Sequence, residues 1–408
     1  MPCTPLAAPA TPAVPAAPTA PSGRLRPTAA FVLVVSLVIS FLAASAAPSP
    51  LYALYREAWG FSAFLLTLVF GSYAFALLAA LLVFGALSDH LGRRTVILGA
   101  LVLEIVAIWL FWAADSVGWL IAARILQGVA TGIATSVLSA MLLDLHPARG
   151  ALFNGLGPMI GMAVGALGAS ALVQFAPEPM HLVYEVLLAV MLVQGVLALR
   201  LPETVTRRPG ALRSMVPSAH VPPAARPILW RVLPLNTAGW ALGGFYLSLG
   251  PTLARWVTGS QTPLVGGALI ATLVLTGALS ICFVRQKPAQ PVLRGSALLL
   301  GAGLVITLFG VHLHNAFFFF GGTLVAGLGF GAGFNAAVRT LVPAAEPHER
   351  AGLMASFFVM SYLAFSVPSL LAGVAVGAFG MHSAALGYGA LLVVLSGLAW
   401  WGARERRA

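Results

Sequence analysis

Apolar segments long enough to cross a lipid bilayer set the limits on what this chain can fold into. A membrane-spanning helix needs about 20 mostly apolar residues, and runs of this length recur along the chain between short stretches of charge, proline or glycine. Twelve spans are expected, at residues 28–53, 63–84, 95–114, 119–141, 151–175, 182–200, 232–257, 263–284, 295–313, 316–341, 351–377 and 383–402. The sequence therefore predicts an all-α membrane protein with 12 transmembrane helices.

The composition excludes the main classes of soluble protein. Only 8% of the 408 residues are charged and 60% are hydrophobic, whereas about 25% of the residues of a soluble domain are charged. The net charge of +11 does not indicate a nucleic-acid partner, because the basic residues are not gathered on one face. Cys3 and Cys282 lie in very different surroundings, so we expect no disulfide, no metal site and no cofactor.

The spans fall into two sets of six. The first set occupies residues 28–200 and the second residues 232–402, which is the pattern that a duplicated six-helix unit would give. The polar segment 201–231 is the expected linker between them. Residues 1–27 are rich in alanine and proline and are expected to be a disordered tail, and residues 403–408 form a short basic tail.

Basic residues predict the orientation in the membrane. If the N-terminus is cytoplasmic, 19 of the 22 lysine and arginine residues lie on the cytoplasmic side, and only Arg56, Arg124 and Arg255 do not. Since cytoplasmic loops are enriched in basic residues, both termini and the linker are predicted to be cytoplasmic. All but one of the basic residues are arginine, which favours a GC-rich genome and therefore the inner membrane of a bacterium.

The loop between the second and third spans carries the most specific motif. It reads GALSDHLGRRTVILG over residues 85–99. Glycines allow tight turns, Asp89 can accept bonds at a helix N-terminus, and the arginines supply countercharge. The loop resembles the signature loop of the major facilitator superfamily, Gly-x-Leu-x-Asp-x-x-Gly-Arg-Arg, and is complete at Gly85, Leu87, Asp89, Gly92, Arg93 and Arg94. The positive-inside rule alone explains the arginines but not the aspartate and the glycines.

This resemblance implies a fold and a moving part. The two six-helix bundles would rock about a shared site near the membrane midplane and expose it to each side in turn. The loop would be a cytoplasmic gating latch, in which Asp89 engages the start of span 351–377 near Glu349 and Arg350. The corresponding loop of the second half, FVRQKPAQPVLRG, has no acidic residue, so only one latch is expected to be complete.

A second motif lies in span 119–141. Arg124, Gln127 and Gly128 are similar to the Arg-x-x-Gln-Gly pattern of the same superfamily. An arginine inside a membrane costs roughly 2.5–3.5 kcal/mol on insertion scales, so Arg124 needs a partner, and Glu104 in span 95–114 is the expected one. The alternative is that Arg124 extends outward to the membrane surface.

Glu104, Arg124 and Gln127 are the candidates for ion coupling. The proton occupancy of Glu104 would change if Arg124 moved away during rocking, which is the physical basis of proton coupling. A permanent ion pair is an equally good interpretation. Span 28–53 has no acidic residue, which departs from many proton-coupled relatives.

Span 151–175 carries half of another motif. Gly157, Pro158 and Gly161 resemble the antiporter motif of drug exporters in this superfamily, but its other glycines are replaced by Asp144, Phe153 and Met162. A proline interrupts helical hydrogen bonding and glycines let helices approach closely. We expect these residues to bend the helix and to favour export, with simple helix packing as the alternative.

Four residues are candidates for lining a central cavity. In the superfamily that cavity is lined by the first, fourth, seventh and tenth spans, with contributions from neighbouring helices. The candidates are Tyr73, Asn236, Trp240 and Asn335. Amide and aromatic side chains are as often used for packing between membrane helices.

Together these features predict a monomeric secondary active transporter rather than an enzyme. No GxxxxGK[ST] loop is present, so the energy would come from an ion or solute gradient, and protons are the expected partner. The preferred function is proton-coupled efflux of a small, partly hydrophobic compound. Proton-coupled uptake of a sugar or organic acid is the first alternative, and a non-transporting membrane sensor is the second.

Overall fold

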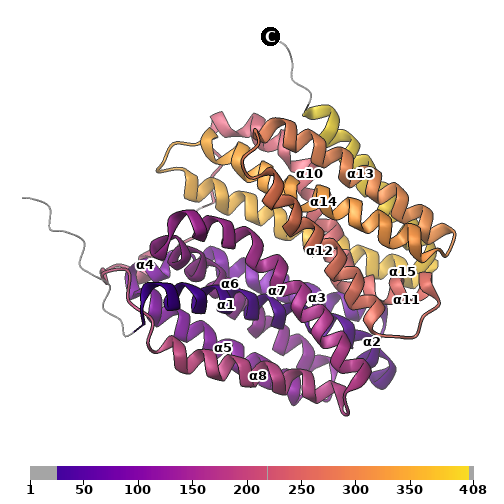
Figure 1. Ribbon diagram of the computed structural model, residues 1–408, viewed down its shortest axis with the longest axis horizontal. Coiled ribbons are helices and arrows are strands. Elements are labelled where there is room, and N and C mark those ends of the chain that lie inside the picture. Colours follow the sequence, from indigo (N-terminus) through magenta and orange to yellow (C-terminus); the bar gives the residue numbers. More distant parts are fainter. Residues whose placement is uncertain (1–24, 218, 404–408) are drawn as a thin grey trace, which may run out of the picture.

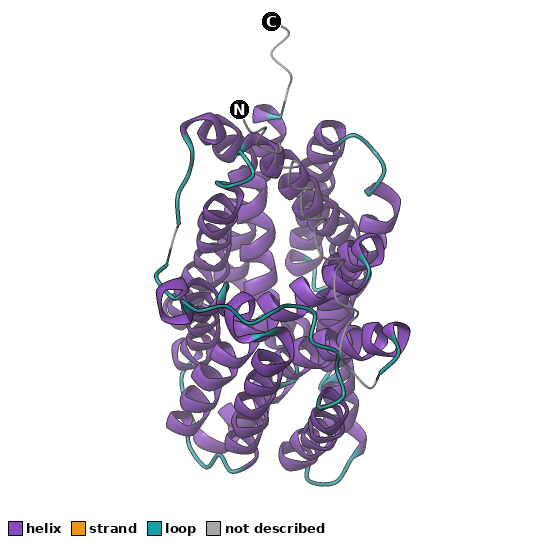
Figure 2. Ribbon diagram, turned by 90° about the vertical axis from the view of Figure 1, so that its left-hand side faces the viewer, coloured by secondary structure: helices purple, strands orange, loops and turns teal. Residues whose placement is uncertain are grey.

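The computed structural model describes residues 25–217 and 219–403, so nearly all of the two expected tails lies outside it (Figure 1). Within these ranges the chain is helical and contains no β-strand. Figure 2, seen from the end of the molecule that carries α4, shows helices joined by short loops and by one longer linker. The prediction of an all-α membrane protein is confirmed.

The N-terminal half contains eight helices among the described residues. They are α1 (Pro27–Ala46), α2 (Pro48–Trp59), α3 (Ala63–Phe84), α4 (Leu87–Leu91), α5 (Arg93–Trp112), α6 (Val117–Leu145), α7 (Pro147–Phe175) and α8 (Pro179–Ala198). The first expected span therefore consists of α1 and α2 and extends six residues beyond its predicted end.

The linker and the C-terminal half provide the other elements. They are α9 (Ala211–Ser214), η1 (Pro223–Ala225), α10 (Arg226–Ser248), α11 (Gly250–Thr258), α12 (Leu264–Val284), α13 (Ala289–His312), α14 (Ala316–Leu341), η2 (Val342–Ala344) and α15 (Arg350–Gly402). Helix α10 begins at Arg226, six residues before the expected start of the seventh span at residue 232.

The twelve expected spans correspond to fewer long helices. In the described part of the chain, 10 helices are long and apolar enough to cross a membrane. Helix α15 contains the last two expected spans. They are separated by a kink at Gly380, whose φ of 79° and ψ of 165° are not helical. Helix α10 is less apolar, with Arg226, Arg231 and Asn236, and it forms the seventh span together with α11.

The first and seventh spans are weakened at equivalent places by proline. Pro48 and Pro50 are at the first and third positions of α2, and Pro251 is at the second position of α11. Proline has no backbone N–H and cannot continue the helical hydrogen-bond ladder. Ala47 nevertheless keeps helical angles, φ −56° and ψ −37°. We call the segment Ala44–Pro50 the α1–α2 joint.

The two halves lie side by side, with the N-terminal half in the lower part of Figure 1. One end, called here the linker end, carries α4 and the linker. The opposite end, called the far end, carries α2 and α11. Between the halves, α3 packs on α15 and α7 on α12.

Close packing between the halves depends on small residues. A Cβ placed on Gly267 of α12 would lie 2.6 Å from the carbonyl oxygen of Ala166 in α7 and would collide with Ser170. The contact between Gly267, Ala166 and Ser170 is called the far-end seam below. Away from these contacts the helices expose apolar side chains, among them Val102, Leu192 and Leu371, as a surface in contact with lipid requires.

Candidate functional site

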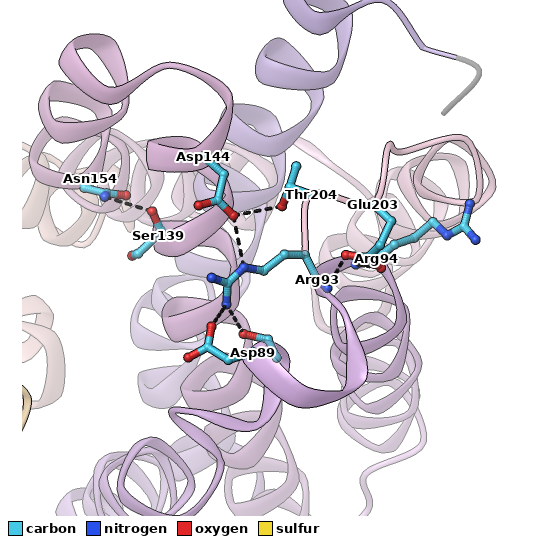
Figure 3. Close-up of polar contacts among 9 residues, drawn as sticks. Asp89, Arg93, Arg94, Ser139, Asp144, Asn154, Glu203 and Thr204 are labelled. Carbon is cyan, nitrogen blue, oxygen red and sulfur yellow. Dashed lines mark hydrogen bonds and ion pairs between the residues drawn. The ribbon is translucent and has the colours of Figure 1, made fainter. Parts of the chain in front are cut away.

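The loop around α4 forms a polar cluster inside the N-terminal half (Figure 3). Arg93 is its centre: Nη1 lies 2.6 Å from Oδ1 of Asp89 and donates to Oγ of Ser88, also at 2.6 Å. Nε of Arg93 donates to Oδ2 of Asp144 at 3.1 Å. The arginine thus ties the start of α5 to the end of α6.

The linker adds a second acid to this cluster. Glu203 accepts hydrogen bonds from the backbone N–H of Arg93 at 2.6 Å and of Arg94 at 3.2 Å. A carboxylate is favoured at this position because the N-terminus of a helix carries partial positive charge. Glycine is required at position 92 for two reasons. Its φ of 93° is unfavourable for other residues, and a Cβ there would lie 2.5 Å from Oε2 of Glu203.

This arrangement differs from the expected latch. Sequence reasoning placed Asp89 at the start of span 351–377, whereas in this structure Asp89 pairs with Arg93. The acid at the N-terminus of α5 is Glu203. Arg350 donates from Nε to the carbonyl oxygen of Ala345, and Glu349 accepts from the N–H of Glu346. None of the polar contacts within residues 25–217 and 219–403 joins Asp89 to either of them. A latch between Asp89 and α15 therefore stays a prediction for another conformation.

Sequence reasoning did not identify Glu203 and Asp144 as members of this cluster. Asp144 was considered only as a departure from the glycine-rich motif, although Thr204 also donates to it at 2.8 Å. A usable signal was present for Glu203, because LPET directly follows an apolar span and supplies the first acid of the linker.

Arg124 lies at the centre of a buried group in the N-terminal half. Only 1% of the residue is exposed, so it does not reach the membrane surface. Its Nε donates to the hydroxyl of Tyr52 at 2.8 Å, and Nη2 donates to the same oxygen. Nη1 donates to the carbonyl oxygen of Ser45 at 2.9 Å and to Oε1 of Gln127 at 2.7 Å.

Gln127 stands between Arg124 and Glu104. Its Nε2 donates to Oε1 of Glu104 at 3.0 Å and to the carbonyl oxygen of Ala44 at 3.2 Å. No direct ion pair joins Arg124 to Glu104 in the described structure. The three candidates lie together, but an amide takes the place of the expected direct bridge. Oε2 of the fully buried Glu104 makes no hydrogen bond of normal geometry, and the hydroxyl of Thr131 in α6, also buried and without a partner, is a polar neighbour of this carboxyl.

The α1–α2 joint explains why this group forms where it does. In a regular helix the carbonyl oxygen of Ala44 would accept from the N–H of residue 48, but Pro48 has none. Gln127 supplies the missing donor. Around the guanidinium, the rings of Tyr52, Tyr73 and Phe111 have their centroids 5.3–5.5 Å from its central carbon, which stabilises a cation without a carboxylate in contact.

The cavity candidates separate into two groups. Tyr73 is buried beside Arg124 and packs near Tyr362 of the C-terminal half. Asn236 and Trp240 line one small cavity together with Phe330 and Phe334. Asn335 does not line that cavity, although its Oδ1 is also buried without a partner.

The proposed bending residues lie inside an uninterrupted helix. Helix α7 runs from Pro147 to Phe175 through Pro158. A Cβ on Gly161 would lie 2.5 Å from the carbonyl oxygen of Ile39 in α1, and one on Gly157 would lie 2.9 Å from Cγ1 of Val38. In this conformation both glycines serve close packing of α7 on α1, and a bending role for Pro158 stays a prediction.

A family model described as Major Facilitator Superfamily matches residues 33–286, which is more than half of the chain. The chain belongs to the major facilitator superfamily. The resemblance inferred from the loop at residues 85–94 is thereby confirmed. As a member of this superfamily, the protein is a multi-pass membrane transporter for a small molecule.

Solved structures with the same fold include three transporters. A bacterial homologue of the human lysosomal transporter Spinster, described as inward-facing and unoccupied, gives a TM-score of 0.72 at 16% identity and covers 94% of this chain and 99% of its own. A point mutant of the nucleoside transporter NupG gives 0.69 at 11% identity, covering 93% and 98%. The human organic anion transporter MFSD10 (TETRAN) gives 0.64 at 17% identity, covering 92% and 100%.

These likenesses establish the two-bundle fold, and at such low identity they say nothing about the substrate. A comparison with curated proteins gave no match.

Proposed function

We propose that this transporter couples the export of a small, partly hydrophobic compound to the entry of protons. The observation that carries the proposal is the position of Glu104. Its carboxyl is fully buried with one free oxygen, and a single amide separates it from the buried cation Arg124. Ionisable groups inside a membrane bundle are costly and mark ion or proton pathways.

The chemistry of the group supports a proton as the coupling ion. Gln127 donates to Oε1 of Glu104, and the second oxygen, Oε2, is the place where a proton would be held. Loss of that proton creates an anion within reach of the Arg124 charge, and gain of it leaves the cation uncompensated. Two occupancies of one carboxyl thus give two charge states of the buried group, which is what coupling requires.

The proposed type of substrate is supported by the hydrogen bonding of Asn236, which leaves its side-chain oxygen available as an acceptor. Ser361 donates its hydroxyl to the carbonyl oxygen of Phe357 at 2.8 Å, so its oxygen must accept from Nδ2 of Asn236, also at 2.8 Å. Oδ1 of Asn236 then has no partner and remains an acceptor. Trp240 and Phe330 line the same small cavity. In this conformation the cavity is too small for an organic compound, so we infer that it widens when the halves move and then admits an uncharged compound that has a flat apolar face and one N–H or O–H donor.

Direction and orientation rest on sequence patterns. Export is favoured by the likeness of Gly157-Pro158-x-x-Gly161 to the antiporter motif of drug exporters. The excess of arginine at the linker end supports a cytoplasmic location for that end. With Cys3 and Cys282 replaced by serine, a membrane-impermeant maleimide should then label Gln286→Cys, an exposed position in the turn after α12, in inverted membrane vesicles but not in intact cells. The opposite pattern would contradict the orientation.

The experiment that tests the proposed coupling uses purified protein in liposomes with an internal pH dye. Compounds of the predicted type are added in the presence of a proton gradient, and proton flux is measured for the wild type and for Glu104→Gln. The matched control is Glu185→Gln, which changes an exposed acid that accepts from Nε1 of Trp112. We expect compound-dependent proton flux to be lost only in Glu104→Gln.

Two results would redirect the proposal. Equal proton flux in Glu104→Gln and wild type would remove Glu104 from coupling. Accumulation of a sugar or organic acid with protons in the same liposomes would favour uptake, the alternative within this family.

A further inference from the structure

Helix α2 is held from inside the N-terminal half by the same arginine that belongs to the buried group. The hydroxyl of Tyr52 is the acceptor for both Nε and Nη2 of Arg124. Both residues are 1% exposed, and hydrogen bonds from a charged donor are about twice as strong as neutral ones. The position of Tyr52 therefore follows the position of the guanidinium.

The guanidinium and its neighbour hold both sides of the α1–α2 joint. Nη1 of Arg124 donates to the carbonyl oxygen of Ser45, and Gln127 donates to that of Ala44. Tyr52 lies beyond Pro48 and Pro50, which supply no N–H to the backbone ladder. Because the joint lacks these hydrogen bonds, the bonds from Arg124 and Gln127 add a connection across it between α1 and α2.

The other end of α2 touches the C-terminal half. The helix contacts α11 and α12, and Oε1 of Glu57 lies 3.9 Å from Nη1 of Arg255. The Glu57 side chain is 70% exposed, so this ion pair adds little stability. Its position shows that the end of α2 lies next to α11 of the other half. A tilt of α2 at its joint would move this end relative to α11.

Glu104 is the one carboxyl among the described residues whose charge reaches Arg124. The titratable and charged groups that face the guanidinium are Tyr52, Tyr55, Tyr73, Glu104 and Tyr184, from α2, α3, α5 and α8. A change in the charge of Glu104 alters the pull on Arg124 through Gln127. Since Arg124 holds Tyr52, the change is passed on to α2.

We propose that Tyr52 is a positioning residue that transmits the charge state of the Arg124–Gln127–Glu104 group to α2 and so to the contact between the halves at the far end. This inference rests on the proposed role of Glu104 in coupling. It assigns the transmission to one hydroxyl group, and it does not require Tyr52 to touch the substrate.

The test measures the distance between α2 and the loop that directly follows α11 in the full-length protein. Spin labels are attached at Ala58→Cys and Gln261→Cys, both exposed positions, after replacement of Cys3 and Cys282 by serine. Double electron–electron resonance spectroscopy then gives the distribution of distances between the two labels, in nanodiscs, for proteins with and without Glu104→Gln. We expect Glu104→Gln to shift the distribution, and Tyr52→Phe to abolish that shift.

Tyr55→Phe is the matched control. Tyr55 lies on the same helix and is buried, but its hydroxyl donates to the hydroxyl of Tyr184 at 2.9 Å instead of binding Arg124. The shift caused by Glu104→Gln should persist in Tyr55→Phe. Loss of the shift in both tyrosine variants, or its persistence in both, would overturn the proposal, as would the absence of any shift in the wild-type background.

A second measurement covers the case in which Tyr52→Phe does not fold. A 3-fluorotyrosine is incorporated at position 52 or at position 55, and its ¹⁹F resonance is compared with and without Glu104→Gln. We expect a larger change in chemical shift at position 52, and equal changes would contradict the proposal. The proton-flux assay tests the proposed function, and the distance measurement tests this inference. A normal proton flux in Glu104→Gln together with a shift in the distance distribution would contradict the proposed function but not this inference.

Discussion

The far-end seam allows the balance between conformations to be altered by one methyl group. In Gly267→Ala the new Cβ would lie 2.6 Å from the carbonyl oxygen of Ala166 and 2.9 Å from Cβ of Ser170. Real Cβ atoms do not approach this closely, and both atoms belong to or adjoin the backbone of α7. Helices α7 and α12 must therefore separate in this conformation.

The size of the effect follows from the cost of overpacking. An extra methyl group in a well-packed contact costs about 1–3 kcal/mol. Alanine is also a better helix former than glycine by about 0.8–1.0 kcal/mol, and that gain cancels when α12 stays helical as the seam opens. If the seam opens when the transporter changes state, the equilibrium constant that favours the closed seam over the open one should fall by a factor of about 5–150.

The assay and its control are both available on the same interface. Labels at Phe175→Cys and Thr262→Cys report the distance between the far ends of α7 and α12, and the Gly267→Ala protein should show a larger population at long distance. Gly71→Ala is the control, because its Cβ would lie at an ordinary 3.4 Å from Leu370. Unchanged distances in a folded Gly267→Ala protein, or an equal shift in Gly71→Ala, would refute the reasoning.

Three further predictions concern the linker and the cavity. Gly92→Ala should lower the free energy of unfolding by about 1–3 kcal/mol, because it adds backbone strain and a collision with Glu203. The loss should be larger than in Gly60→Ala, because Gly60 also has a left-handed φ, 63°, but its Cβ would meet open space. Melting temperatures in detergent compare the two variants, and equal losses would contradict the role of Glu203. Glu203→Gln should cost about 1–2 kcal/mol in the same assay because it removes the charge at the N-terminus of α5, and an unchanged melting temperature would refute that capping role. Asn236→Leu should remove any preference for indole over 1-methylindole, measured by thermal stabilisation of the protein, because only indole can donate to Oδ1; a preference that survives the substitution would argue against Asn236 as the acceptor.

The helices could be predicted from the sequence because hydropathy is a local signal. The span expected at 63–84 coincides with α3, and the span at 316–341 coincides with α14. The breaks inside the first and seventh spans were less visible, since Pro48 and Pro251 weaken the helix without ending its apolar run.

The contacts of the candidate site were harder to predict, because they depend on how helices are rotated about their axes. Arg124 and Glu104 were expected to meet, yet the rotation of α6 places Gln127 between them. Glu203 lies 110 residues from Arg93 in sequence, and no periodicity in either segment indicates that they meet. Such pairings are properties of the assembled bundle.

The attachment of the linker at both of its ends restricts how far the halves can travel. On the N-terminal half, His90 binds the linker through the N–H of Arg208 and the carbonyl oxygen of Pro209. On the C-terminal half, the N–H of His220 donates to the carbonyl oxygen of Gly352. The eleven residue steps from Pro209 to His220 can reach at most about 36–40 Å when fully extended. While both attachments hold, the linker sets a maximum distance between the two attachment points. Shortening the linker by deletion would therefore limit how far the halves can separate at this end, without altering any residue that contacts the solute.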